Sequence, residues 1–106
     1  DGPGDYTNYA SCSWVIAPKD AMSITLSFRS FSTESDADFV RVYFCNSPQC
    51  DPSSNWLLWE FSGSSLPEGD VIFTTGILIT FTSDGSNTNP GFVADYVAAI
   101  RSPIRV

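Results

Sequence analysis

Residues 23–29 read SITLSFR, and this stretch decides the fold class because apolar and polar side chains alternate strictly along it. A period of two places the apolar side chains on one face of a β-strand and the polar ones on the other. Residues 77–82 and 92–97 repeat the pattern. Further strands are predicted at residues 13–17, 39–44, 56–61 and 71–74. No stretch of the sequence has the apolar spacing of an amphipathic helix.

None of the seven prolines lies within a predicted strand. Proline cannot donate a hydrogen bond to a sheet ladder, so it marks turns and edges. The turn signals recur at a spacing of about 8–12 residues, which is typical of an all-β sandwich or barrel. The chain of 106 residues has the length of one domain. We therefore expect a single domain over residues 1–106, an all-β fold built as an antiparallel β-sandwich.

The composition excludes several classes of function. Twelve Asp and Glu residues against five Lys and Arg residues give a net charge of −7, which disfavours binding to nucleic-acid phosphates and to anionic lipid. No apolar run reaches the roughly 18 residues of a membrane span. The chain has no His, the commonest general base, so we expect no enzymatic activity. A glycosidase pair of carboxylates is also disfavoured, because a domain of this size has little room for a deep sugar cleft.

Three cysteines indicate the compartment. Cys45 and Cys50 bracket a short polar loop, NSPQ, and the simplest interpretation is a local disulfide, which would contribute about 2 kcal/mol. The alternatives are two free thiols or half of a metal site, although zinc would lack further ligands. A disulfide favours an extracellular, oxidising compartment. Cys12 is then either a buried thiol or the partner of a residue upstream of Asp1.

Acidic residues stand at two turns. Glu34 and Asp38 flank the turn within FSTESDADFV, and Asp84 opens the loop within FTSDGSNTNPGF. If both turns lie at the same end of the sandwich, their carboxylates converge and need a proton or a cation. Ligands that are all oxygen suit Ca²⁺ better than Mg²⁺, which prefers to keep several waters. The alternative is a pair of solvated turns without an ion, since Asp and Asn are common in turns.

The segment NWLLWEF, residues 55–61, is apolar on both faces. Large apolar side chains are usually buried, so we expect this strand to lie between the sheets, with Trp56 or Trp59 shielded by the loop between Cys45 and Cys50. The alternative is an exposed aromatic patch for a partner.

Several short motifs follow one another along nearly the whole chain. They are Gly4-Asp5-Tyr6, Cys12-x-Trp14-x-Ile16, Ile24-x-Leu26-x-Phe28, Asp38-Phe39-Val40, Phe61-Ser62-Gly63, Ser83-Asp84-x-Ser86 and Gly91-Phe92-x-Ala94-x-Tyr96. In this order and spacing they resemble a CUB domain. The resemblance implies a β-sandwich of the jelly-roll type, secreted or at the cell surface. It also implies a non-enzymatic interaction or adhesion module of a larger multidomain protein.

A large subset of the family binds Ca²⁺ at one end of the sandwich, and this chain resembles that subset. By position, the three acidic ligands match Glu34, Asp38 and Asp84, a backbone-carbonyl ligand matches Ser86, and a side-chain ligand matches Asn87. Tyr6 matches a tyrosine that sits beside the ion and can meet a partner, so we expect Tyr6 to face outward. The resemblance thus favours Ca²⁺ over solvated turns. It also implies a protein partner that offers a Lys or Arg, which an ion-fixed carboxylate holds by a charge-assisted hydrogen bond.

The chain departs from the family pattern in its disulfides. The resemblance implies that Cys12 pairs with an upstream cysteine. The second family disulfide is missing, because residues 34–38 hold no cysteine and Ser62 stands at the other position. Cys45–Cys50 then takes the place of the missing bridge. Asp36, inside the shortened turn, is a further residue that could substitute for a ligand.

Two other functions stay open. Some relatives recognise carbohydrate, which predicts exposed Trp or Tyr rings near the loops. The chain could also be a purely structural unit of an extracellular assembly, with contacts on both sheets.

Overall fold

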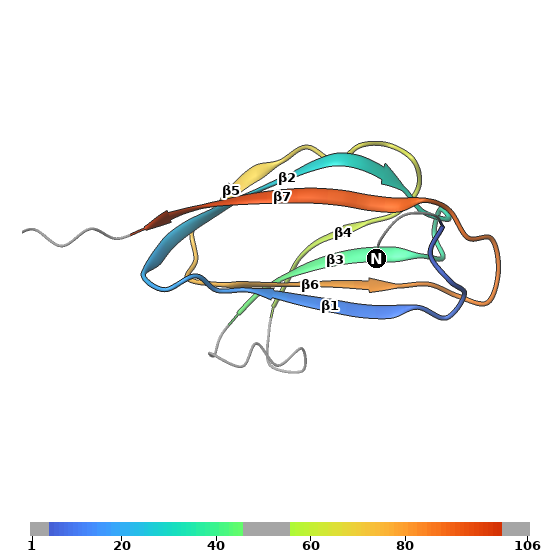
Figure 1. Ribbon diagram of the computed structural model, residues 1–106, viewed down its shortest axis with the longest axis horizontal. Coiled ribbons are helices and arrows are strands. Elements are labelled where there is room, and N and C mark those ends of the chain that lie inside the picture. Colours follow the sequence, from blue (N-terminus) through green and yellow to red (C-terminus); the bar gives the residue numbers. More distant parts are fainter. Residues whose placement is uncertain (1–4, 46–55, 101–106) are drawn as a thin grey trace, which may run out of the picture.

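The computed structural model describes residues 5–45 and 56–100, and the regular elements in these ranges are all β-strands (Figure 1). They are β1 (Ser11–Ile16), β2 (Ala21–Ser32), β3 (Phe39–Phe44), β4 (Trp56–Phe61), β5 (Asp70–Ile72), β6 (Ile77–Thr82) and β7 (Gly91–Ile100). The all-β prediction is confirmed, and β3, β4 and β6 have the predicted bounds. In this part of the chain no helix is long and apolar enough to cross a membrane.

The strands form two antiparallel sheets that face each other (Figure 1). One sheet has four strands in the order β1-β6-β3-β4, and the other has three in the order β5-β2-β7. β2 and β7 pair along most of their length, with register shifts between Ala21 and Ser23 and between Phe28 and Ser30. Such irregularities increase the twist of a strand, which lets the long pair curve over the four-stranded sheet. The two layers are the sandwich that the sequence predicted.

The core lies between the sheets and follows the alternation of the sequence. Within residues 23–29, the three apolar side chains are at most 7% exposed. Leu78 breaks the alternation, because it lies on the outer face of its sheet and is still only 2% exposed. Its neighbours in register on the two flanking strands are Val15 and Tyr43, so it has a paired strand on each side. The central position of β6 in its sheet therefore buries a residue that the period of two places outside.

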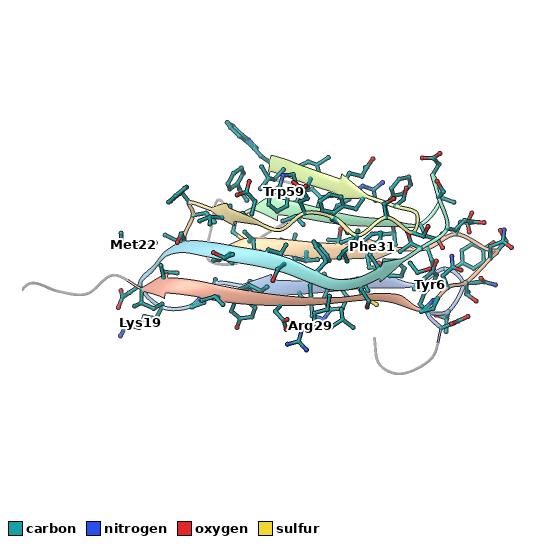
Figure 2. All side chains as sticks on the ribbon, turned by 90° about the horizontal axis from the view of Figure 1, so that it is seen from above. Tyr6, Lys19, Met22, Arg29, Phe31 and Trp59 are labelled. Carbon is teal, nitrogen blue, oxygen red and sulfur yellow. The ribbon has the colours of Figure 1, made fainter. Side chains whose placement is uncertain are left out.

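Aromatic rings fill one part of the core. The Phe28 ring contacts those of Phe31, Phe61 and Phe92, with centroids 5.6–6.1 Å apart. The Tyr6 ring belongs to the same buried cluster. Figure 2 shows Phe31 and Tyr6 toward the same end of the sandwich, so the loops at that end rest on a tightly packed base.

β4 is an edge strand, and its burial differs in part from the prediction. Trp56 is 74% exposed and Leu57 is 52% exposed, whereas Trp59 packs against the core. The expectation of a strand buried on both faces is therefore wrong for Trp56. The physical reason is that an edge strand is paired on one side only, and the register with β3 shifts between Val42 and Tyr43.

Cys50 lies outside the residues that the structure describes, so the Cys45–Cys50 disulfide stays a prediction. Cys12 is half-buried on β1.

Candidate functional site

Two loops meet at one end of the sandwich, which we call the acidic pole (Figure 1). The first is the turn at residues 33–38 between β2 and β3, and the second is the loop at residues 83–90 between β6 and β7. β3 and β6 are neighbours, and Phe39 at the start of β3 lies opposite Thr82 at the end of β6. The residue before Phe39 and the residues after Thr82 therefore emerge side by side.

Three carboxylates converge at the acidic pole. One oxygen each from Glu34, Asp38 and Asp84 lies within 4.8 Å of the other two. In residues 5–45 and 56–100, this is the one group of at least three His, Cys, Asp or Glu side chains that could hold a metal ion. The structure thus brings together the three acidic residues that the sequence singled out. At this separation the three negative charges repel one another, so the group attracts a cation.

Asp38 is the fixed point of the cluster, with an exposed fraction of 0%. Its Oδ1 accepts a hydrogen bond from the backbone N–H of Asp84 at 2.9 Å, and its Oδ2 accepts one from the Tyr6 hydroxyl. Both oxygens of the buried carboxylate are therefore satisfied by donors. Burial, reinforced by the bond to Asp38, raises the pKa of the Tyr6 hydroxyl to about 12. Tyr6 consequently stays a neutral donor at physiological pH.

Glu34 has one oxygen without a partner. Its Oε2 accepts from the side-chain amide of Asn87 at 2.5 Å, but Oε1 is buried and accepts no hydrogen bond. A buried acceptor without a donor is costly, and a cation placed between the three carboxylates would satisfy it. Asp84 is partly exposed, and its Oδ1 accepts from the backbone N–H of Ser86 at 3.1 Å. The donor set is all oxygen, which fits a hard ion such as Ca²⁺.

Local hydrogen bonds shape the turn that carries Glu34 and Asp38. Thr33 and Gly63 exchange two bonds, from Thr33 N–H to the Gly63 carbonyl at 2.8 Å and from Gly63 N–H to Thr33 Oγ1 at 3.0 Å. The Asp36 N–H donates to Ser62 Oγ at 3.1 Å. The serine at the position of the missing disulfide thus ties the turn to the end of β4.

Asp36 does not join the cluster. It is exposed, it adopts a positive φ of 60°, and it is absent from the group of converging carboxylates. The left-handed conformation at Asp36 reverses the chain between Glu34 and Asp38 and lets those two residues face the same side. In this geometry Asp36 shapes the turn and does not act as a ligand.

Residues 6–10 are held along the second loop by backbone and side-chain bonds. The Tyr9 N–H donates to the Asp84 carbonyl at 2.8 Å, and Ser83 N–H donates to the Ala10 carbonyl at 3.0 Å. The Ser83 hydroxyl accepts from Ala10 N–H and donates to the Thr7 carbonyl, each at 2.7 Å. Ser83 is therefore a positioning residue for the acidic pole, and its role follows from contacts that the sequence alone does not reveal.

The two tyrosines of this segment differ from the expectation. Tyr6 is only 8% exposed and points into the core, so the outward-facing placement expected for it is wrong. Tyr9 is 79% exposed and lies beside the second loop. The physical reason is that the Tyr6 hydroxyl finds a buried acceptor in Asp38, whereas the Tyr9 backbone turns away with a φ of 55°.

Within residues 5–45 and 56–100, no Lys or Arg side chain neutralises the three carboxylates of the acidic pole. Arg29 pairs with Asp95 at 2.5 Å, and Arg41 pairs with Glu60 at 2.8 Å. Lys19 lies at the opposite end of the sandwich (Figure 2). The negative charge at the acidic pole is therefore open to an external cation.

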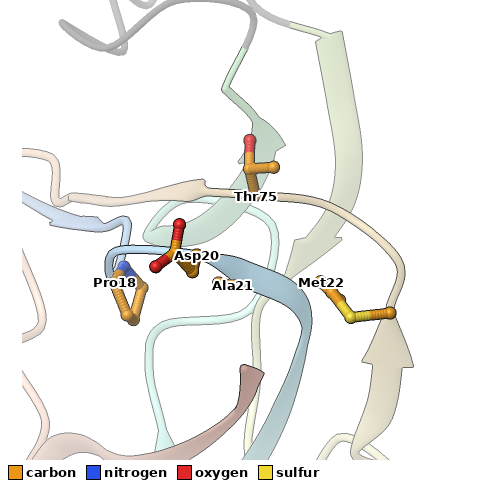
Figure 3. Close-up of a pocket in the computed structure, with 5 residues that line it drawn as sticks. All are labelled: Pro18, Asp20, Ala21, Met22 and Thr75. Atoms are coloured by element: carbon orange, nitrogen blue, oxygen red, sulfur yellow. The ribbon is translucent and has the colours of Figure 1, made fainter. Parts of the chain in front are cut away.

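A pocket at the opposite end offers no comparable chemistry (Figure 3). It has a volume of about 450 Å³ and is lined by Pro18, Asp20, Ala21, Met22 and Thr75. Its one carboxylate, that of Asp20, has no second acidic residue in the lining.

The comparisons of this chain with family models, known proteins and solved structures agree on one family. The family model described as the CUB domain matches residues 1–96. Rat cubilin is 34% identical over 91% of this chain and 3% of its own length. Mouse ovochymase-2 is 29% identical over 98% of this chain and 17% of its own length, so the chain spans a small part of these relatives. The solved structure of the MASP-1 CUB2 domain bound to Ca²⁺ superposes with a TM-score of 0.73 at 24% identity, covering 91% of this chain and 84% of that one.

Proposed function

The chain belongs to the CUB domain family, and from this premise we propose that it is an extracellular interaction module whose acidic pole binds Ca²⁺. CUB domains are non-catalytic, and we assign no reaction to this one. The observation that carries the proposal is the buried Glu34 Oε1, which lacks a hydrogen-bond donor within a group of three converging carboxylates. We further propose that residues 1–106 act as one domain of a larger multidomain protein.

The residues of the acidic pole would hold the ion in distinct ways. Glu34, Asp38 and Asp84 would supply carboxylate oxygens. Ser86 would add a backbone carbonyl, and Asn87 would add a side-chain oxygen once its amide turns away from the Glu34 Oε2 that it contacts. Bound Ca²⁺ neutralises part of the charge and fixes the two loops relative to each other. The chain's own contribution is to hold Asp38 rigidly, because both of its oxygens already accept hydrogen bonds.

The partner of this site is proposed to be a protein that presents a Lys or Arg. The whole chain carries a net charge of −7, and the described cations lie away from the acidic pole or are paired. A carboxylate that is fixed by an ion and still partly exposed, as Asp84 is, offers a charge-assisted hydrogen bond to a basic side chain. Such complementarity favours basic partners over neutral ones.

Calorimetric titration of the folded chain tests the calcium proposal. We expect one site for Ca²⁺ with a dissociation constant of about 10⁻⁴ to 10⁻³ M, as in other extracellular modules, and weaker binding of Mg²⁺. Asp84→Asn removes one ligand charge and keeps the side-chain shape, so Ca²⁺ affinity should fall about tenfold or more.

Asp20→Asn is the matched control, because it makes the same charge change at the opposite pole. It should leave Ca²⁺ affinity unchanged. Absence of a calcium site in the unmodified chain, or equal affinity of the Asp84→Asn variant, would contradict the proposal.

A further inference from the structure

Tyr9 is a large aromatic residue that the core does not use. Its side chain is 79% exposed, and it is absent from the buried cluster and the partly buried residues that pack against it. Its φ of 55° lies in the left-handed region, which is uncommon for a residue other than glycine. Because the side chain is exposed, its burial does not offset the strain of this backbone conformation. Residues with such strain are concentrated at binding sites.

The position of Tyr9 is nevertheless well defined. Its backbone N–H donates to the Asp84 carbonyl at 2.8 Å, and the next residue, Ala10, is bonded to Ser83. Its ring edge lies directly over Gly85, where an added Cβ would come within 2.6 Å of the ring carbon Cζ. Glycine at position 85 therefore leaves room for the ring, and the ring is held against the loop that carries Asp84.

Acidic residues belong to both segments that hold the ring. Asp84 is bonded to Tyr9 through the backbone, and its carboxylate belongs to the same cluster as that of Glu34. Asp5 is exposed four residues before Tyr9 in the chain. A tyrosine face beside carboxylates attracts a cation by both its quadrupole and the nearby charge. Tyr6 cannot supply such a face because it is buried.

We propose that Tyr9 is the partner-contacting residue of the acidic pole, where its ring packs against a Lys or Arg side chain of a protein partner. The charged end of that side chain pairs with the carboxylate of Asp84, and its apolar stem lies along the ring. This inference rests on the proposed function, since it names the contact that the calcium-fixed pole makes. It also assigns to Tyr9 the contact with the partner that the resemblance to the family implies for Tyr6.

The test uses a single basic side chain as the probe, Nα-acetyl-lysine methylamide, with the norleucine analogue as its uncharged counterpart. Ca²⁺ affinity is first measured by calorimetry, and the probe is then titrated into the calcium-loaded protein by NMR. In the unmodified chain, the lysine probe should shift the Tyr9 ring resonances and the amide of Gly85, and the norleucine analogue should not. Tyr9→Ala should weaken lysine binding by about 3- to 30-fold, the range expected for loss of a cation–π contact, with Ca²⁺ affinity unchanged.

Three further variants separate the effect of the aromatic face at position 9 from the effects of apolar bulk and of losing a tyrosine elsewhere. Tyr9→Phe keeps the aromatic face and should bind lysine within about twofold of the unmodified chain, whereas Tyr9→Leu keeps apolar bulk without that face and should behave like Tyr9→Ala. Tyr96→Ala removes a half-exposed tyrosine from β7 and should change neither affinity. Retained Ca²⁺ affinity shows that each variant is folded.

The possible failures are distinguishable. If the unmodified chain binds no Ca²⁺, the proposed function is wrong. If it binds Ca²⁺ but not the lysine probe, or if Tyr9→Ala and Tyr9→Leu bind the probe as well as the unmodified chain, the role of Tyr9 is overturned.

Discussion

Replacing Asp38 with alanine is expected to abolish calcium binding and to lower the free energy of unfolding of the calcium-free protein by about 2–4 kcal/mol. Asp38 is fully buried and accepts hydrogen bonds from the Tyr6 hydroxyl and from the Asp84 N–H. Its removal leaves the buried Tyr6 hydroxyl and the partly buried Asp84 N–H without an acceptor, and each such group costs about 1–3 kcal/mol when fully buried. Relief of repulsion among the remaining carboxylates offsets part of this loss. The loss of calcium binding follows because the best-fixed ligand has gone.

Chemical denaturation without calcium and calorimetry with calcium measure the two effects separately. Asp38→Asn keeps an acceptor for Asp84 and should be less destabilised than Asp38→Ala, yet it should also bind Ca²⁺ poorly because the charge is lost. Asp36→Asn is the matched control in the same turn, since Asp36 is exposed and outside the cluster and asparagine tolerates its left-handed backbone. Loss of calcium binding in Asp36→Asn with retention in Asp38→Asn would show that the wrong aspartate was assigned.

Replacing Phe28 with alanine is expected to lower the free energy of unfolding by about 3–5 kcal/mol. Phe28 is 7% exposed, and its ring contacts those of Phe31, Phe61 and Phe92. The substitution removes apolar burial, leaves a cavity and breaks the aromatic contacts that join both sheets. For a small domain whose total stability is about 5–15 kcal/mol, this is a large fraction of the whole.

Urea unfolding at fixed calcium concentration measures this loss. Val97→Ala on the paired strand β7 is the control, because Val97 is 70% exposed and its truncation should change stability by no more than about 0.5 kcal/mol. Comparable effects of the two substitutions would contradict the assignment of Phe28 to the core.

The strands could be predicted because their signal is local. Residues 23–29 alternate between apolar and polar, and the structure buries the apolar set. Burial that depends on the neighbours of a strand could not be predicted in this way. Leu78 is covered because β6 is central in its sheet, and Trp56 is exposed because β4 is at an edge.

The acidic pole could be predicted only through resemblance to a family. Spacing cannot bring Glu34 and Asp84 together, since they are separated along the chain by the whole of β3, β4, β5 and β6. Their meeting depends on the pairing of β3 with β6, which places the start of one strand beside the end of the other.

The roles of the two tyrosines could not be predicted from the sequence. Tyr9 follows Tyr6 by three positions, and the two are the same type of residue. A buried acceptor and a left-handed backbone decide which of them faces inward. Both features come from tertiary contacts and have no local signal in the sequence.

If two separate loops place three carboxylates around one calcium ion, a crystal structure of the chain grown with Ca²⁺ will show it. We expect a single ion at the acidic pole, with oxygens of Glu34, Asp38 and Asp84 at about 2.3–2.6 Å from it. The Glu34 oxygen that accepts no hydrogen bond in the present structure should be among these ligands. An ion bound elsewhere, or a structure at high calcium concentration in which these oxygens coordinate none, would show that the acidic pole is not a calcium site.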